Sequence, residues 1–177
     1  SEEIKKGSHV HLHNLMFHEF DRNHKFLKKD LSQSYKNNRF FYGYKRQNGT
    51  VGTRNYIGLI STVNCSATVV KKIADRINKY LLDKQFINID GAVCIKHSSG
   101  CGINTSGKGM EVFNRTIEGI KSHQNFGKVF VIGLGCECAQ ISLYKDSNKD
   151  NIEYLNIQDE GGTNQIINNV FNKVVEE

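Results

Sequence analysis

Four short apolar runs alternate with amphipathic stretches along most of this chain, and that alternation constrains the fold more than any other feature of the sequence. Each run has the length of a buried strand and is rich in β-branched residues, which favour strands. Apolar residues recur at helical spacing after the first, second and fourth runs, whereas a polar loop follows the third. The runs cover residues 55–63, 91–96, 128–134 and 152–157.

Strands that alternate with helices in this way predict right-handed crossovers and a mostly parallel sheet covered on both faces. We therefore expect an α/β fold, a Rossmann-like three-layer domain with a sheet of about four strands, over residues 43–177. An extended tail at residues 1–15 and a linker at residues 16–42 are expected to precede it. At 177 residues and 38% hydrophobic, the chain can bury one core of its own.

Residues that carry chemistry follow these strands. All strands of a parallel sheet point the same way, so the loops at their carboxyl ends share one edge, where ligands bind in open α/β sheets. We expect neighbouring loops to converge there. They cover residues 64–65, 97–102, 135–138 and 158–163.

Three cysteines stand in three of these loops: Cys65, Cys101 and Cys136. The chain has five cysteines, an odd number without a secretory signal, which indicates reduced thiols rather than a disulfide framework. Three thiols at one edge could hold iron, as a mononuclear site or as an iron-sulfur cluster. The alternative is that cysteine fills tight turns beside glycine.

Two further side chains are candidates for the same edge. His97 ends a strand and could act as a base, an acid or a ligand, because its ordinary pKa lies near working pH, although a lone histidine is more often structural. Glu137 could ligate a metal or occupy a helix N-terminus.

Anion binding has two candidate places. Gly161, Gly162 and Thr163 precede a helix, whose N-terminal N–H groups favour a carboxylate or phosphate. Arg54 and Asn55 come just before the first strand and so belong to the opposite edge, unless a loop or bend brings Arg54 to a substrate.

Near the start of the chain, His9, His11 and His13 alternate with apolar residues, and a period of two puts them on one face of an extended segment. Three imidazoles on one face could ligate a divalent metal. The alternative, more common for such a pattern, is a polar strand face or an expression artefact.

The net charge of +6 would permit an acidic partner, but the Lys and Arg residues are scattered and form no basic stripe with interleaved aromatics. We expect a small anionic substrate rather than nucleic acid. No apolar run is long enough for a membrane span and no signal peptide opens the sequence, so we expect no membrane partner and a cytoplasmic protein.

Five segments in order resemble the altronate/galactarate dehydratase family of sugar-acid hydro-lyases. They are Gly43-Tyr-Lys-Arg-Gln-Asn-Gly-Thr-Val-Gly-Thr-Arg-Asn-Tyr56, Val63-Asn-Cys-Ser-Ala-Thr68, His97-Ser-Ser-Gly-Cys-Gly102, Gly133-Leu-Gly-Cys-Glu137, and Gln158 with Gly161-Gly162-Thr163. The histidine-rich residues 7–14 resemble the end of the SAF (β-clip) domain that precedes this region in the fused enzymes.

The resemblance implies removal of water from a sugar acid to give a 2-keto-3-deoxy acid, with iron or another divalent metal such as Mn²⁺. It implies His97 and Glu137 as catalytic residues, and Cys65, Cys101 and Cys136 as the iron environment. The implied substrate binders are Arg54, Asn55, Asn64, Gln158, Gly161, Gly162 and Thr163. We further expect a homo-oligomer, and a chain that lacks the C-terminal part of the same enzyme.

Two alternatives remain open. A sulfo-lyase that acts on sulfolactate resembles the same family but keeps the SAF part as a separate subunit, which the fused histidine-rich tail argues against. A non-catalytic α/β module that binds a sugar acid or supports assembly comes from another class, and a chain without its C-terminal part could behave in that way.

Overall fold

The computed structural model describes residues 4–11, 14–16, 19, 40–84, 86–145 and 151–176, and it divides into two compact units, Ser1–Arg39 and Phe40–Glu177. All helices and strands of the described residues belong to the second unit. In chain order they are β1 (Tyr44–Lys45), β2 (Val51–Gly52), β3 (Tyr56–Ser61), η1 (Asn64–Ser66), α1 (Ala67–Lys84), β4 (Gly91–Ile95), α2 (Lys108–Lys121), β5 (Phe126–Gly133), η2 (Ile141–Leu143), β6 (Ile152–Asn156) and α3 (Thr163–Glu176).

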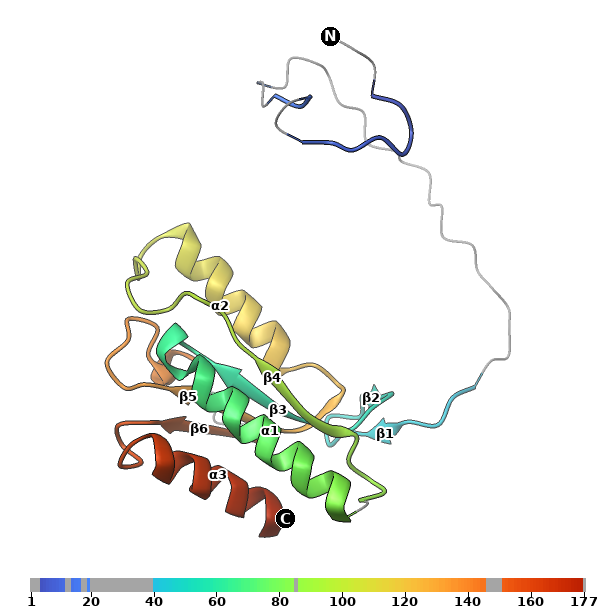
Figure 1. Cartoon of the computed structure of the whole chain (residues 1–177), viewed down its shortest axis with the longest axis vertical. Coiled ribbons are helices and arrows are strands. Elements are labelled where there is room, and N and C mark those ends of the chain that lie inside the picture. Colours follow the sequence, from blue (N-terminus) through green and yellow to red (C-terminus); the bar gives the residue numbers. More distant parts are fainter. Residues whose placement is uncertain are drawn as a thin grey trace. The chain divides into compact units, whose positions relative to one another are not determined.

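The main sheet has four parallel strands in the order β4-β3-β5-β6 (Figure 1). The central strand β3 pairs on one side with β4, with Ile60 opposite Ile95, and on the other side with β5, with Ile60 opposite Val131. The prediction of a mostly parallel sheet of about four strands is therefore confirmed.

Helices cover both faces of this sheet, and the side chains of each strand divide between them with a period of two. Helices α1 and α3 pack together on one face, where Leu59 and Phe130 are fully buried. Helix α2 lies on the other face, where its Ile117 packs with Ile60 and Val129 (Figure 1). The result is the three-layer α/β arrangement that the alternating pattern predicts.

The strand order places a topological switch point at β3. From β3 the chain first adds β4 on one side, then crosses back to add β5 on the other. In open α/β sheets, ligands bind at the carboxyl ends of the strands beside such a switch point.

A small antiparallel hairpin, β1 with β2, precedes the sheet, and Gly49 at its turn has a φ of +83°, which glycine adopts without strain. Arg46 fastens the hairpin to the domain. Its guanidinium donates to Gln124 O at 2.8 Å, Asn55 Oδ1 at 2.8 Å and Arg54 O at 3.0 Å. Burial lowers the pKa of Arg46 from its ordinary value, and the three acceptors compensate for lost hydration. None of the helices in the described residues could span a membrane.

Candidate functional site

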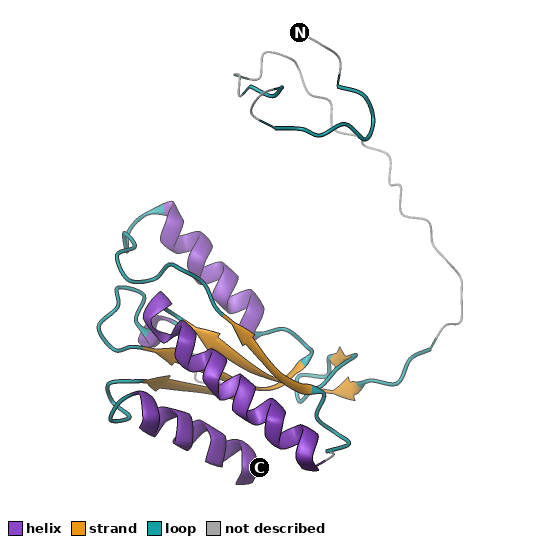
Figure 2. Cartoon of the chain, viewed as in Figure 1, coloured by secondary structure: helices purple, strands orange, loops and turns teal. Residues whose placement is uncertain are grey.

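Four loops meet at the carboxyl edge of the sheet, on the side where the arrows of the four parallel strands end in Figure 2. The N–H of Asn64, after β3, donates to Ser99 O at 2.9 Å in the loop after β4. The N–H of Ala139, after β5, donates to Gly100 O at 3.3 Å in that same loop. The N–H of Gln158, after β6, donates to Leu134 O at 3.0 Å. The convergence expected from a parallel sheet is thus observed.

Gly100 allows the loop after β4 to cross over the end of β3. Its φ is +98°, and a Cβ at this position would overlap Thr62 O and approach Val63 Cα to 3.0 Å. Gly100 is buried in this crossing. Only glycine meets both conditions, so this residue sets how close the loops after β3, β4 and β5 can lie.

His97 links two of these loops through its imidazole ring. Its Nε2 lies 2.8 Å from Ser61 O, and because a carbonyl oxygen only accepts, Nε2 carries the proton. Its Nδ1 accepts from the Ser99 N–H at 3.2 Å, and its ring packs edge-on against Phe113 at 4.9 Å. Both nitrogens are bonded to backbone here, so a role as base, acid or ligand stays a prediction that requires one bond to open.

Glu137 turns its carboxylate inward, and the residue is 2% exposed. Its Oε1 accepts from Thr62 Oγ1 at 2.8 Å and from the Leu134 N–H at 3.1 Å, and its Oε2 accepts from the Gly135 N–H at 2.7 Å. These donors replace lost hydration and tie the end of β5 to the end of β3. The structure thus places Glu137 as a buried brace between the ends of β5 and β3; its catalytic role stays a prediction.

Gln140 was absent from the sequence-based candidates, yet it supports the same loop. Its Nε2 donates to Glu137 O at 2.7 Å and to Gly135 O at 3.1 Å. No local sequence pattern predicts this role of Gln140, because the role depends on the path that the loop takes after β5. A polar residue three positions after an expected site residue is the weak signal that was present.

The four cysteines in these loops, Cys65, Cys101, Cys136 and Cys138, are exposed. Cys94 lies within β4 against the core, and burial raises the pKa of its thiol. The structure places Cys138, rather than Cys136, in backbone contact with Cys101, through an N–H to O bond of 3.4 Å. In the part of the chain that the structure describes, no group of three or more His, Cys, Asp or Glu residues could hold a metal ion. The described residues therefore do not form a complete iron site.

The expected anion-binding turn precedes α3. Gly161 and Gly162 have φ values of +81° and +106°, and their N–H groups donate within the turn, to Gln158 O at 3.3 Å and Ile157 O at 2.8 Å. Donors for a ligand would therefore be the first N–H groups of the helix itself, from Thr163 onward, which have no acceptor within a helix. The Gln158 side chain lies against Gly135, where its Oε1 occupies the space of a Cβ.

Arg54 and Asn55 lie at the amino-terminal edge, on the far side of the six-residue strand β3, about 20 Å along the strand direction. Asn55 bonds there to its neighbours, with its N–H 2.6 Å from Asp90 Oδ2 and its Nδ2 2.7 Å from Asn88 O. The structure therefore does not bring these two residues to the edge that carries Asn64, Gln158 and Thr163 within one chain.

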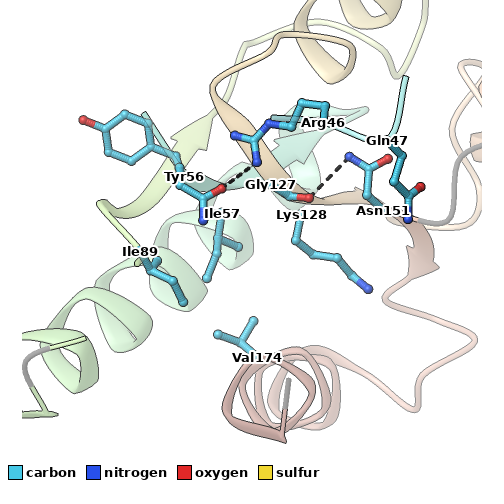
Figure 3. A pocket seen from close by; sticks show the side chains of 10 residues that line it. Arg46, Gln47, Tyr56, Ile57, Ile89, Gly127, Lys128, Asn151 and Val174 are labelled. Atoms are coloured by element: carbon cyan, nitrogen blue, oxygen red, sulfur yellow. Dashed lines mark hydrogen bonds between the residues drawn. The ribbon is translucent and has the colours of Figure 1, made fainter. Parts of the chain in front are cut away.

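A pocket of about 440 Å³ opens at this amino-terminal edge (Figure 3). Arg46 and Asn55 form part of its wall and are bonded to each other, and Val174 of α3 lines another side. Lys128 also faces it and pairs with Glu153 Oε1 at 2.8 Å. The cations that line the pocket thus already have protein acceptors, and the pocket lies far from the converging loops.

In the N-terminal unit, the rings of His9 and His11 stack with centroids 5.7 Å apart and an interplanar angle of 19°. The Asn14 side chain bridges their backbone, accepting from the His11 N–H at 2.9 Å and donating to His9 O at 2.9 Å. His13 lies outside the described residues. A metal site on these histidines stays a prediction.

A buried lysine at the end of α2 binds the loop between β5 and β6. Lys121 Nζ donates to Tyr144 O at 2.6 Å and to Tyr154 Oη at 3.0 Å, and it pairs with Glu118 Oε1 at 2.6 Å. Tyr144 is 1% exposed and donates to Asn114 Oδ1 at 3.0 Å. Burial, followed by the negative charges of Glu137 and Glu118, raises the pKa of Tyr144 to about 12.

This raised pKa predicts alkaline instability that Tyr144→Phe reduces. The Tyr144 phenol holds its proton more firmly in the folded protein than in the unfolded chain. Its contribution to the free energy of unfolding is therefore complete below the ordinary pKa of 10.0 and is lost as the pH rises toward about 12. The loss amounts to about 2 to 3 kcal/mol. Urea unfolding from pH 8 to pH 12 measures it. Parallel pH profiles for the wild type and Tyr144→Phe would contradict the assignment.

The parallel sheet and the convergence of its carboxyl-end loops define an α/β domain of the kind that carries enzyme sites at a switch point. The family model described as "D-galactarate dehydratase/Altronate hydrolase, second domain" matches residues 43–177. The chain belongs to this family, as the resemblance of its five segments indicates.

Curated relatives agree with this assignment. An altronate dehydratase of Bacillus subtilis (strain 168) is 30% identical over 152 residues, which cover 85% of this chain and 30% of the relative. An altronate dehydratase of Escherichia coli (strain K12) is 31% identical over 152 residues, 84% of this chain and 30% of the relative. The galactarate dehydratase (L-threo-forming) of Escherichia coli (strain K12) is 43% identical over 101 residues, which cover 56% of this chain and 19% of the relative. The chain thus spans less than a third of these relatives, and no solved structure matches it.

Proposed function

We propose that this chain is part of a hydro-lyase that dehydrates a sugar acid of the altronate or galactarate type to a 2-keto-3-deoxy acid. One observation carries the proposal: the family match over residues 43–177 contains all four loops that meet at the carboxyl edge. The relatives are named as dehydratases of altronate and galactarate, which supports this substrate class.

The chemistry of such a reaction matches groups at this edge. Removing the proton next to the substrate carboxylate creates an enediolate, which fixed donors must stabilise while an acid helps the β-hydroxyl leave. The first N–H groups of α3, from Thr163, would bind a carboxylate, with Gln158 and Asn64 as polar neighbours. His97 would act as the base: once its Nδ1 no longer accepts from the Ser99 N–H, that nitrogen can take the proton from the substrate. In this proposal Arg54 and Asn55 remain outside the substrate site, at the opposite edge.

We also propose a divalent metal, iron in the first instance and Mn²⁺ as an alternative, with Cys65, Cys101 and Cys136 as its environment on this chain. When bound, such an ion would act as a Lewis acid on the developing enediolate. The described residues offer no group of three ligands. Ligands from outside them would have to complete the site, and we derive no reaction step through the metal.

A non-catalytic role in sugar-acid binding or assembly is the second candidate. It is favoured by His97, whose two ring nitrogens are both bonded to backbone, and by the incomplete set of metal ligands among the residues that the structure describes. Under this reading the four loops are a scaffold that places residues from other parts of the enzyme.

Turnover by the full-length protein tests the proposal. With Fe²⁺ under reducing conditions, we expect formation of the 2-keto-3-deoxy acid from altronate or galactarate, and loss of at least 100-fold in kcat for His97→Ala and Cys101→Ala. His123→Ala is the matched control, because His123 is exposed and lies at the other edge of the sheet. Anaerobic iron and sulfide analysis of each variant accompanies the assay.

The outcomes separate the two candidate functions. A full-length protein that converts neither acid would contradict the dehydratase proposal. Normal turnover and iron content in His97→Ala and Cys101→Ala would leave the reaction in place and overturn the assignment of these residues. A lowered melting temperature with unchanged kcat would make His97 a purely structural link.

A further inference from the structure

Two cysteines have their backbones in contact where the loops after β4 and β5 cross. The N–H of Cys138 donates to Cys101 O at 3.4 Å, and the next residue, Ala139, donates to Gly100 O at 3.3 Å. Two successive backbone bonds therefore hold these segments side by side. Strands β4 and β5 are not neighbours in the sheet, because β3 separates them.

This contact brings the two backbones together in the way that a disulfide requires. Paired residues of an antiparallel ladder that exchange both N–H to O=C bonds have Cα atoms about 5.5 Å apart, and Cys101 and Cys138 share one such bond. Disulfides form over Cα separations of about 4.4 to 6.8 Å, most often between about 5.5 and 6 Å. Cys101 and Cys138 are also exposed, so a reagent in solution can reach both.

The other cysteines meet these conditions less well. Cys94 is partly buried against the core, and burial raises the pKa of its thiol, which lowers its reactivity. Among the backbone bonds of the described residues, the one that joins Cys101 to another cysteine goes to Cys138, although Cys136 is also exposed. Cys136 and Cys138 are two positions apart, too close in sequence for an unstrained disulfide.

We propose that Cys101 and Cys138 form a dithiol that is converted to an intramolecular disulfide by low-molecular-weight disulfides. One thiolate attacks the disulfide reagent, forms a mixed disulfide and releases one small thiol. The second thiolate attacks the protein sulfur of that mixed disulfide and releases the other small thiol. The reagent is reduced to two thiols, the two cysteines lose two protons and two electrons, and one S–S bond joins the loops.

The cross-link would fix the crossing at Gly100 and withdraw the Cys101 thiol from any ligand. Formation of the bond requires neither substrate nor metal. The inference is therefore independent of the proposed dehydratase activity, and thiol chemistry can test it without an assay of turnover.

The experiment treats the chain with oxidised glutathione under native conditions and digests it with trypsin after blocking the remaining thiols. Cleavage after Lys and Arg places Cys101 in residues 97–108 and Cys138, together with Cys136, in residues 129–145. We expect these two peptides to be disulfide-linked, whereas Cys65 and Cys136, which are also exposed, go no further than mixed disulfides with glutathione. Dithiothreitol should restore all five thiols.

Matched variants identify the partner. Cys136→Ser should form the link as fast as the wild type. In Cys138→Ser and Cys101→Ser the yield of linked peptides should fall at least tenfold, and the remaining cysteine should stop at a mixed disulfide with glutathione. A link that persists in Cys138→Ser, or that disappears in Cys136→Ser, would assign the bond to Cys136 and overturn the proposal. Mixed disulfides alone in the wild type would overturn it as well.

Discussion

Gly100→Ala is expected to lower the free energy of unfolding by about 3 kcal/mol or more, or to prevent folding. The added Cβ overlaps the Thr62 carbonyl oxygen and meets Val63 Cα at 3.0 Å, and the φ of +98° is strained for any residue with a Cβ. Both neighbours are backbone atoms at the end of a central strand, so neither can rotate away. Urea unfolding of the purified variant measures the loss.

Gly102→Ala is the matched control in the same loop. A Cβ at Gly102 has no neighbour within 4 Å, and this position lies outside the set of glycines with positive φ. Its effect should stay within about 0.5 kcal/mol of the wild type. Equal stabilities for the two variants would show that the loop does not cross the end of β3 in the way described.

Glu137→Gln is expected to destabilise the protein by about 2 to 4 kcal/mol. The carboxylate accepts bonds on both oxygens, from the N–H groups of Leu134 and Gly135 and from Thr62. An amide nitrogen in place of either oxygen would direct a donor at a backbone N–H in a site that water does not reach. Thermal and urea unfolding at neutral pH measure the effect.

Glu111→Gln is its control, since Glu111 is exposed in the first turn of α2 and its variant should lie within about 0.5 kcal/mol of the wild type. The pair also tests the role that the family resemblance implies. If Glu137→Gln unfolds like the wild type but loses iron or turnover, the carboxylate acts in the reaction, and its role as a brace is contradicted.

The regular part of the fold was predictable because it depends on local patterns. Strand alternation and helical spacing predicted the elements, the parallel sheet and the edge at which the loops meet. Element ends were less accurate: β5 begins at Phe126, two residues before the predicted strand, because Phe126 packs beneath α2. That packing partner is distant in sequence, so no local pattern contains it.

The candidate site was predictable in position but not in detail. His97 and Glu137 follow strands as expected, yet both are held by other groups of the protein. His97 donates to Ser61 O at the end of β3, and Glu137 accepts from the Thr62 hydroxyl and from the Gly135 N–H. Which acceptor a side chain meets depends on how one loop crosses another. The same reason explains the cysteines, since Cys136 and Cys138 look alike in sequence and only the crossing selects Cys138 as the neighbour of Cys101.

The position of β3 has a consequence for synthesis on the ribosome. The first strand of the sheet to emerge is the central one, and its partners begin 35 and 70 residues later, at Gly91 and Phe126 opposite Tyr56. At about 5 to 20 residues per second, the second partner follows after roughly 4 to 14 s. Until then one edge of β3 is unpaired, and Ile60 lacks Val129, with which it packs in the finished domain. The nascent chain thus carries an apolar strand with an open side, a substrate for chaperones, until β5 has been translated.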